Sequence, residues 1–384
     1  MSRFTIRNAV LGLSGTLGDV VVADGVIDSV LPGGAADDGE SFEAAGRCIF
    51  PGFVDCHTHA CWAGSRLDEW EQGLAGVSYL DILRAGGGIM STVRAVRGAS
   101  QRELADALAG RLATCLRHGT TTIEVKSGYG LTTEDELKML RAIHDARARW
   151  PGTIVPTACI GHAKDPAEAN PVGLTLQEVL PAVTREFPGI TIDAYCEKGA
   201  WSVNDALRLL DAAIAAGHPV RVHADQFNDL GIIPEAVRRQ FRSVDHLEAS
   251  KPDHLALLAE SDTFGVMLPM AGWHLDDRYA DGASFLAGGG TLALGSNLNP
   301  GSAPCYSMSA VVAQATRKLK IPIEAALDSA TKLPARLLGL SDRGELVPGQ
   351  RADLVLLDTA DLRDVAFFGG WNPVVGVWVA GRQV

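Results

Sequence analysis

The chain has 384 residues, of which 47% are hydrophobic and 21% charged, and it carries a formal net charge of −12. It is too long for one minimal domain but suits a barrel of about 250 residues with a smaller unit attached. It contains no apolar run of about 18 residues, as a membrane span would need, and its negative charge excludes nucleic acid as an expected partner.

The seven cysteines are scattered, odd in number and without a Cys-x-x-Cys pair. This pattern is typical of reduced thiols rather than of a disulfide framework. Residues 1–10 contain two arginines but no continuous apolar stretch and no small-residue cleavage site, so no secretion signal is expected. We therefore expect a cytoplasmic protein with no membrane partner.

Short β-like runs separated by Gly/Asp turns occur at both ends of the chain, at residues 5–11, 19–21, 26–30, 352–357 and 374–379. Two terminal β segments that flank a central region can pair with each other. We predict that residues 1–50 and 343–384 form one small β-sandwich domain. The alternative is two unrelated extensions.

The middle of the chain, residues 51–342, alternates apolar runs with helical stretches. Eight runs are candidate strands, at residues 49–54, 120–125, 154–160, 190–195, 220–222, 243–245, 263–268 and 291–294. Alternation of this kind favours a parallel sheet, and eight strands favour a closed (β/α)8 TIM barrel of the α/β class. No glycine-rich phosphate fingerprint follows the first strand, which argues against a dinucleotide-binding fold.

Two helix starts carry the pattern of a capping box, at Ser100-x-x-Glu103 and Thr133-x-x-Glu136. Leucines at helical spacing follow the first of them. Both segments are therefore predicted to be helices that pack against the barrel strands.

Five of the ten histidines fall at the C-terminal ends of predicted strands, where the active site of such a barrel lies. His57 and His59 follow the first strand, and their spacing of two places both imidazoles on one side of an extended segment. His162 follows the third strand, His223 the fifth and His246 the sixth. A single histidine is more often structural, but packing alone does not explain the whole set.

The strand-end histidines therefore predict a metal site. Three or four nitrogen ligands suit zinc or iron(II), with a position left open for water. Such a metal acidifies its water and polarises a carbonyl oxygen, so attack of water on an amide-like carbon is the expected chemistry. The four histidines in helical or linker stretches are expected at the surface, namely His118, His144, His218 and His254.

The segment Pro51-Gly52-Phe53-Val54-Asp55-Cys56-His57-Thr58-His59 resembles the signature of the metal-dependent amidohydrolase superfamily. Residues 344–355 resemble the segment that returns those enzymes to their β-sandwich. Within the superfamily, the chain is most similar to the imidazolonepropionases. The similarity rests on residues 84–94, Lys126-Ser127-Gly128-Tyr129-Gly130-Leu131, residues 222–226 and Asn299-Pro300-Gly301.

The resemblance implies hydrolytic opening of 4-imidazolone-5-propionate to formiminoglutamate, with one divalent ion, Zn2+ or Fe2+, as cofactor. It implies that His57, His59 and His223 hold the metal and that His246 lies beside the ring carbonyl. It also implies a small anionic heterocyclic substrate and a homodimer. Five further positions are implied to contact the substrate: Arg66, which would bind its carboxylate, and Tyr79, Tyr129, His162 and Gln226. The alternatives are a surface salt bridge for Arg66 and core packing for the tyrosines.

The chain departs from the family pattern after the eighth strand. The family has Thr-Asp-x-Asn-Pro-Gly there, and its aspartate ligates the metal and moves the proton, whereas this chain has Ser296-Asn297-Leu298-Asn299-Pro300-Gly301. Asn297 can offer a carbonyl oxygen to the metal but cannot act as a base. His246, His274 or Asp225 would then move the proton. The change favours a modified ring, for example ring-N-methylated or 2-thio, as substrate.

Two other readings remain open at this point. The same chemistry could expel ammonia or sulfide from a related heterocycle, which would make the protein a deaminase or a desulfhydrase. A non-catalytic metal-binding protein is the third reading, because Asn297 replaces the aspartate. Cys305, just past the eighth strand, is either a participant in the site or a buried thiol.

Overall fold

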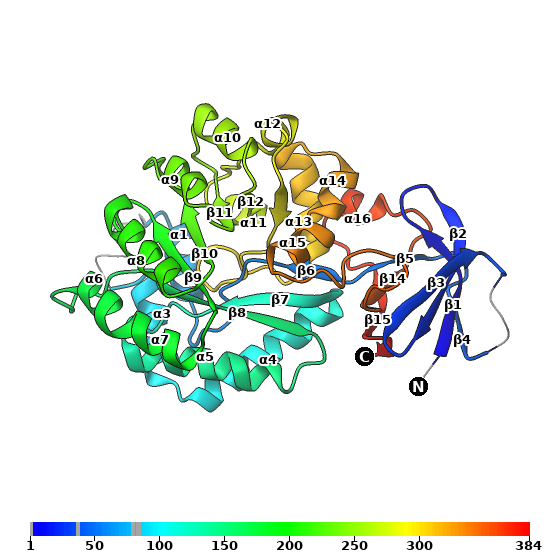
Figure 1. Ribbon diagram of the computed structural model, residues 1–384, viewed down its shortest axis with the longest axis horizontal. Helices are drawn as coiled ribbons and strands as arrows, with labels where there is room; N and C mark the ends of the chain where they lie inside the picture. The colour runs from blue at the N-terminus through cyan, green and yellow to red at the C-terminus, as the bar shows by residue number, and fades with distance from the viewer. Residues whose placement is uncertain (1–2, 36–38, 78–80, 82–85) are drawn as a thin grey trace.

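The protein is described here from a computed structural model that covers residues 3–35, 39–77, 81 and 86–384. Its strands form two separate sheets, a parallel one from the middle of the chain and a mainly antiparallel one from the two ends (Figure 1). The parallel sheet and its helices make up the larger body, and both chain ends lie in the smaller sheet beside it (Figure 1).

The larger body is the predicted eight-stranded parallel barrel. Its strands pair in chain order, and every pairing is parallel. A parallel bridge between Thr58 and Leu298 joins the segments that follow the first and last strands, and so brings the sheet close to full closure. The strands are β6 (Phe53–Asp55), β7 (Thr120–Lys126), β8 (Thr153–Gly161), β9 (Thr191–Cys196), β10 (Val220–Ala224), β11 (Ser243–His246), β12 (Phe264–Met267) and β13 (Leu292–Leu294).

Helices cover the outside of the barrel because each crossover must bury an apolar stripe against the parallel strands. On α4, for example, Leu104, Leu108 and Leu112 are all fully buried. The helices of the chain are α1 (Leu67–Leu74), α3 (Ile89–Gly98), α4 (Gln101–Arg117), α5 (Thr133–Arg147), α6 (Pro171–Leu174), α7 (Leu180–Glu186), α8 (Val203–Ala215), α9 (Ile233–Arg238), α10 (Pro252–Ala259), α11 (Pro269–His274), α12 (Gly282–Ala287), α13 (Met308–Gln314), α14 (Ile323–Asp328), α15 (Lys332–Leu337) and α16 (Asp364–Phe367), with π-helical turns η1 (Thr175–Val179) and η2 (Ala315–Leu319).

One of the two predicted capping boxes is confirmed and the other is wrong. Ser100 caps α4, and Glu103 returns a bond to the Ser100 backbone, as a capping box requires. At α5 the cap is Thr132, which accepts from the Asp135 backbone. Glu136 is not part of a cap, because its carboxylate turns away to bind the loop before the helix.

The smaller sheet contains strands from both ends of the chain, as predicted. Their order is β16-β15-β14-β5-β1-β2-β3, with β4 paired to β1. The sheet curls around its own core, because Phe42 and Trp378, from strands far apart in that order, pack edge to face with ring centroids 5.3 Å apart. The strands are β1 (Arg3–Leu11), β2 (Thr16–Ala23), β3 (Val26–Pro32), β4 (Ser41–Glu43), β5 (Cys48–Pro51), β14 (Leu354–Leu357), β15 (Val374–Val379) and β16 (Arg382–Gln383).

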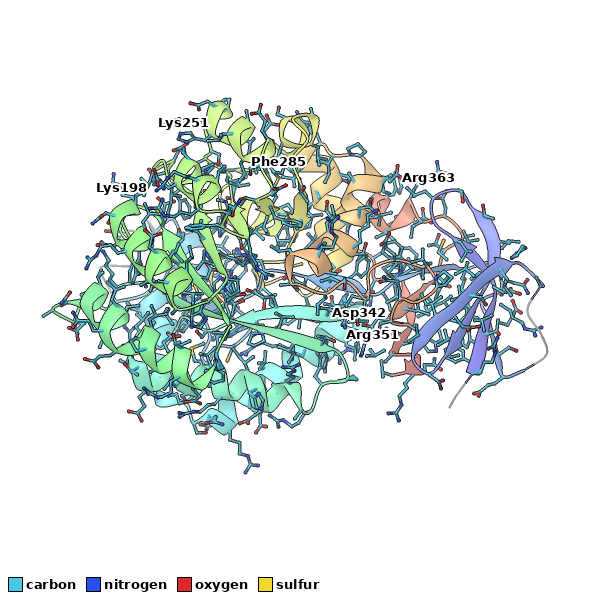
Figure 2. The ribbon with its side chains drawn as sticks, viewed as in Figure 1. Lys198, Lys251, Phe285, Asp342, Arg351 and Arg363 are labelled. Atoms are coloured by element: carbon cyan, nitrogen blue, oxygen red, sulfur yellow. The ribbon has the colours of Figure 1, made fainter. Side chains whose placement is uncertain are left out.

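The predicted strand at residues 49–54 is two strands, β5 in the terminal sheet and β6 in the barrel. The chain passes from one to the other at Gly52, whose N–H donates to the Asp353 carbonyl at 2.8 Å. A Cβ at this position would collide with the Thr121 side chain, so only glycine fits. Asp342 and Arg351 lie at the same junction, where the Arg351 N–H donates to the Asp342 carbonyl (Figure 2).

These two sheets support our proposal that residues 1–50 with 343–384 form one unit and residues 51–342 the other. Among the described residues, no helix is both long enough and apolar enough to cross a membrane.

Candidate active site

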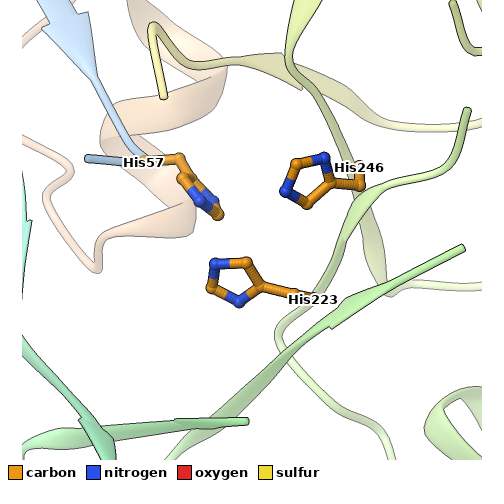
Figure 3. Close-up of side chains that lie close together, drawn as sticks. All are labelled: His57, His223 and His246. Atoms are coloured by element: carbon orange, nitrogen blue, oxygen red, sulfur yellow. The ribbon is translucent and has the colours of Figure 1, made fainter. Parts of the chain in front are cut away.

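Three of the predicted strand-end histidines converge at one end of the barrel. His57 follows β6, His223 lies in β10 and His246 ends β11. One ring nitrogen of each histidine lies within 4.8 Å of one from each of the other two, and all three side chains are buried (Figure 3). Parallel strands present the residues at their C-terminal ends to one shared space, which is why three distant segments meet here.

His59 joins the same cluster. Its Nε2 lies 3.1 Å from the Nε2 of His223. The usual zinc–imidazole distance is about 2.0–2.1 Å. For an ion at that distance from both nitrogens, the nitrogen–ion–nitrogen angle would be about 100°, close to the tetrahedral angle. The two imidazoles are therefore spaced as ligands of one ion.

The cluster has nitrogen atoms that the protein leaves without partners. His57 Nε2 and His59 Nδ1 are buried and have no hydrogen-bond partner. The other nitrogen of His57 faces Asp245 Oδ2 at 2.6 Å, and His223 Nδ1 faces Asp193 Oδ1 at 3.0 Å. Carboxylates behind metal-binding imidazoles fix the ring tautomer in this way.

The histidines are also held in the neutral form that binds metal. Burial, with the positive charge of Lys126 next in importance, keeps the pKa of His57 well below its usual value. Burial likewise lowers the pKa of His59 and of His223. The unpaired Nε2 of His57, the close approach of His59 Nε2 to His223 Nε2 and the uncharged state of these three imidazoles together fit a divalent metal ion.

Asn297 lies on the loop after β13 and is buried. Its N–H donates to the His57 carbonyl at 3.0 Å, so this loop is attached directly to a predicted metal ligand. Its backbone has a φ of 55°, in the left-handed region that asparagine tolerates better than most residues.

His246 is held by a residue that the sequence did not single out. Its Nδ1 faces Glu248 Oε1 at 3.0 Å, and Glu248 Oε2 is buried without a partner. His246 also has a φ of 90°, a strained conformation for a residue with a side chain and a frequent one at functional sites. Its spacing of two residues from Glu248 was the only signal that could have identified this partner.

His162 and Tyr129 form one wall beside the cluster. The His162 ring stacks on His59 with centroids 4.6 Å apart and an interplanar angle of 12°, and Tyr129 lies 5.2 Å from His162. The carbonyl of Gly128 is 3.0 Å from His162 Nδ1. Burial lowers the pKa of His162 to about 3, so it is a neutral ring next to the metal ligands.

Gln226 is held by Tyr195, whose ring centroid lies 6.3 Å from that of His162. The Tyr195 hydroxyl donates to Gln226 Oε1 at 2.8 Å, and its ring lies 5.8 Å from His223. The sequence analysis did not select Tyr195. It lies near the C-terminal end of β9, so the strand-end rule that selected the histidines could have found it.

Arg66 precedes α1 and is mostly buried, with 13% of its side chain exposed. Its Nε and Nη2 both contact Glu69 Oε2 at 2.6 Å, and the same oxygen accepts from the Gly88 N–H at 3.0 Å. Its Nη1 points the other way, toward Gly301, where an added Cβ would come within 3.0 Å of it. A salt bridge is thus present, but it occupies only one edge of the guanidinium.

Two of the predicted site residues are not joined to the clustered histidines. Asp225 accepts from the Ser250 hydroxyl at 2.7 Å, and burial raises its pKa to about 6. His274 ends α11, half-buried, with its ring 6.4 Å from Trp273. Within the described residues, neither forms a hydrogen bond to the clustered histidines. Tyr79 lies outside the described residues.

Two expectations about other residues can be judged. Cys305 is a buried thiol 3.6 Å from the Ser307 carbonyl, and all seven cysteines are free and buried. His218 was expected at the surface, which is wrong. It is buried, and its two ring nitrogens lie 2.9 Å from the Thr184 hydroxyl and 2.7 Å from the Ile190 carbonyl.

Comparison with known proteins adds to this picture. The amidohydrolase family model matches residues 48–384. Imidazolonepropionase of Herpetosiphon aurantiacus is 44% identical over 90% of this chain and 84% of its own length, and that of Deinococcus radiodurans is 42% identical over 95% and 91%.

Solved structures share the fold at lower identity. The 5-methylcytosine deaminase of Klebsiella pneumoniae aligns with a TM-score of 0.78 at 17% identity, over 99% of this chain and 97% of that one. The N-isopropylammelide isopropylaminohydrolase of Burkholderia multivorans aligns with a TM-score of 0.75 at 20% identity, over 100% and 98%. At this identity the likeness concerns the fold alone.

Proposed function

Since the chain belongs to the amidohydrolase family and, within it, to the imidazolonepropionases, which hydrolyse a C–N bond of a cyclic imidazolone, we propose that its substrate is 4-imidazolone-5-propionate or a ring-N-methylated or 2-thio analogue. The product of the unmodified ring would be formiminoglutamate. The observation that carries the proposal is the cluster of buried imidazoles at the barrel mouth, in which His57 Nε2 has no hydrogen-bond partner among the described residues.

In this proposal His57, His59 and His223 hold one divalent ion, zinc or iron(II), and the side-chain oxygen of Asn297 completes the set. Both metals accept imidazole nitrogen, so the donor set suits either. A bound ion would supply a Lewis acid that polarises the ring carbonyl and acidifies a water molecule. The protein's own contribution is to place the ring and to move protons.

The substrate carboxylate would bind Arg66. Glu69 holds the Nε edge of the guanidinium, which leaves Nη1 directed toward Gly301 and free to bind a carboxylate oxygen. Burial raises the pKa of the neighbouring Tyr129, so its hydroxyl stays a neutral donor. Tyr79 is assigned to the same wall on the family resemblance.

Gln226 and His162 would bind the ring. Tyr195 donates to Gln226 Oε1, so the amide NH2 of Gln226 is left to donate to a ring acceptor. His162, neutral and stacked on His59, offers an apolar ring face to the flat substrate. These contacts favour a planar heterocycle with a carboxylate tail.

His246 is our choice for proton transfer among the three candidates. Asn297 and Gln226 carry amides, which cannot accept a proton at neutral pH. Glu248 accepts from His246 Nδ1 and so directs Nε2 toward the cluster. Asp225 accepts from Ser250 through Oδ2 while its Oδ1 is buried without a partner among the described residues, and His274 lies beside Trp273; within those residues neither bonds to the clustered histidines.

The test is to assay the wild-type enzyme and Asn297→Asp on the plain, the N-methylated and the 2-thio ring. We expect the wild type to be fastest on a modified ring and Asn297→Asp to gain activity on the plain one. A wild type fastest on the plain ring rules out the modified substrate. Release of ammonia or sulfide without ring opening would identify a deaminase or desulfhydrase instead.

We also infer that the protein works as a homodimer, as the family resemblance implies, with a small anionic heterocycle as its partner molecule. Sedimentation analysis of the purified chain tests this directly, since a monomer at micromolar concentration contradicts it.

A further inference from the structure

A continuous chain of hydrogen-bonded charges connects two of the metal-binding imidazoles beneath the cluster. It starts at His57, whose Nδ1 faces Asp245 Oδ2 at 2.6 Å, and the same oxygen accepts from Arg221 at 2.5 Å. Arg221 reaches Glu124 Oε1 at 3.3 Å, and that oxygen accepts from Lys126 at 2.7 Å.

The chain of charges then returns to the cluster. Lys126 Nζ donates to Asp193 Oδ2 at 2.7 Å, and Asp193 Oδ1 faces His223 Nδ1 at 3.0 Å. We call these five residues the charge arch. They come from four barrel strands, β7, β9, β10 and β11, and each has at most 2% of its side chain exposed. The members are Glu124, Lys126, Asp193, Arg221 and Asp245.

Stability alone does not account for the charge arch. Taking charges out of water is costly, and well-packed apolar side chains often stabilise an interior as well or better. The arch also touches the proposed metal centre at both ends. The carboxylates at the two ends of the arch belong to Asp245 and Asp193. Each accepts hydrogen bonds from one imidazole and from one of the two cations. The cation therefore holds the carboxylate in place, and the carboxylate in turn holds the imidazole ring.

Arg221 is the more constrained of the two cations. Its guanidinium also donates to the Ser243 hydroxyl and the Cys56 carbonyl, both at 2.8 Å. It thus reaches the residue directly before His57 as well as the carboxylate behind His57. A lysine at this position would keep the charge but could not make these bonds together.

We propose that Lys126 and Arg221 are positioning residues of the metal centre. Acting through Asp193 and Asp245, they hold the His223 and His57 rings with Nε2 toward the ion, and so set the metal affinity of the site. Three carboxylates against two cations also leave one net negative charge under an ion whose proposed ligands are all uncharged. This inference rests on the proposed function of the histidine cluster.

The test compares Arg221→Lys with Arg343→Lys. Both arginines are buried and make several hydrogen bonds, but Arg343 lies at the junction of the barrel with the terminal sheet, bonded to Asp342 and Thr153. Each substitution keeps the positive charge and removes the planar guanidinium group, so Arg343→Lys is a matched control. Lys126→Met is the second arch variant. Zinc affinity is measured on chelator-stripped full-length protein by competition with a chromogenic chelator, and the melting temperature is measured with and without zinc.

We expect Arg221→Lys and Lys126→Met to bind zinc about 10- to 100-fold more weakly, the usual effect of losing a partner of a metal ligand. The gain in melting temperature on adding zinc should shrink in these two variants alone, because that gain depends on affinity. A purely structural role would lower the melting temperature of the stripped protein and leave the gain unchanged.

Several results would overturn the inference. Unchanged zinc affinity in Arg221→Lys does so, and that variant alone decides the question if Lys126→Met does not fold. Tighter binding in Lys126→Met would mean that net charge matters and positioning does not. An equal loss in Arg343→Lys would show a general effect of destabilisation. If the wild-type protein binds no zinc, the proposed function itself is contradicted, and this result is distinct from a failure of the inference about Lys126 and Arg221.

Discussion

Glu136 provides a test of how the substrate wall is held. Its buried carboxylate accepts three backbone N–H groups, from Gly128 through Oε2 at 3.0 Å and from Gly130 and Leu131 through Oε1 at 2.8 and 2.9 Å. Tyr129 lies within this loop. Glu136→Gln keeps one oxygen for two of the donors but turns an NH2 toward the Gly128 N–H.

The cost follows from the number of donors left unpaired, at about 1–3 kcal/mol for each buried one. Glu136→Gln should therefore lose about 1–3 kcal/mol of unfolding free energy. Glu136→Ala orphans all three donors and should lose about 3–9 kcal/mol, which approaches the whole stability of an ordinary domain. Because Tyr129 moves with the loop, both variants should raise KM more than they lower kcat.

Urea unfolding and steady-state kinetics measure these effects. Glu103→Gln is the matched control, since Glu103 bonds one backbone N–H at an exposed helix start, and its substitution should cost much less than that of Glu136. Equal losses of unfolding free energy in the Gln and Ala variants of Glu136, or an unchanged KM in both, would show that Glu136 does not hold the loop in this way.

Four further predictions follow from the structure. Gly301→Ala places a Cβ 3.0 Å from Arg66 Nη1 and should raise KM several-fold with little change in kcat, which steady-state assays would detect. All seven thiols are buried, so native protein should not react with a thiol reagent, whereas unfolded protein should react at every cysteine. Burial raises the pKa of Cys48 and Cys305 from 9.0 to about 11, so the native state keeps protons that the unfolded chain loses. The unfolding free energy should therefore fall as pH rises from about 9 to about 11. Chemical denaturation across that pH range measures this fall. Removal of the metal should lower stability by about 4 kcal/mol if the free ion had been present at about 1,000 times its Kd, and calorimetry with and without chelator measures this.

The barrel and the convergence of the histidines could be predicted because they depend on local pattern and simple topology. Each barrel strand is an apolar run between turn residues, and parallel strands send their ends to one place. His57, His223 and His246 needed nothing beyond this rule to be placed together. The split at Gly52 was missed because two strands in different sheets read as one apolar run.

The partners of the site residues were harder to predict because they depend on side-chain direction. Glu248 lies on a loop, Tyr195 on a strand and Glu69 on helix α1, and no periodicity in the sequence marks any of them as a partner of the site. The same limit explains the wrong prediction of a capping box at Thr133. The helix cap is Thr132, one residue earlier, and the Glu136 carboxylate binds the loop instead. Side chains inside the barrel, such as Lys126, give no hint of their cross-strand partners until the register is known.

The central claim is that one divalent ion, held by His57, His59 and His223, supports opening of an imidazolone ring. Its most direct test is a zinc titration of chelator-stripped protein, with turnover of 4-imidazolone-5-propionate and its modified analogues followed at each addition. We predict that the rate of ring opening rises linearly with added zinc and levels off at one equivalent per chain. His223→Ala should stay inactive throughout the titration. Full activity without added metal, or no ring opening with either zinc or iron(II), would contradict it.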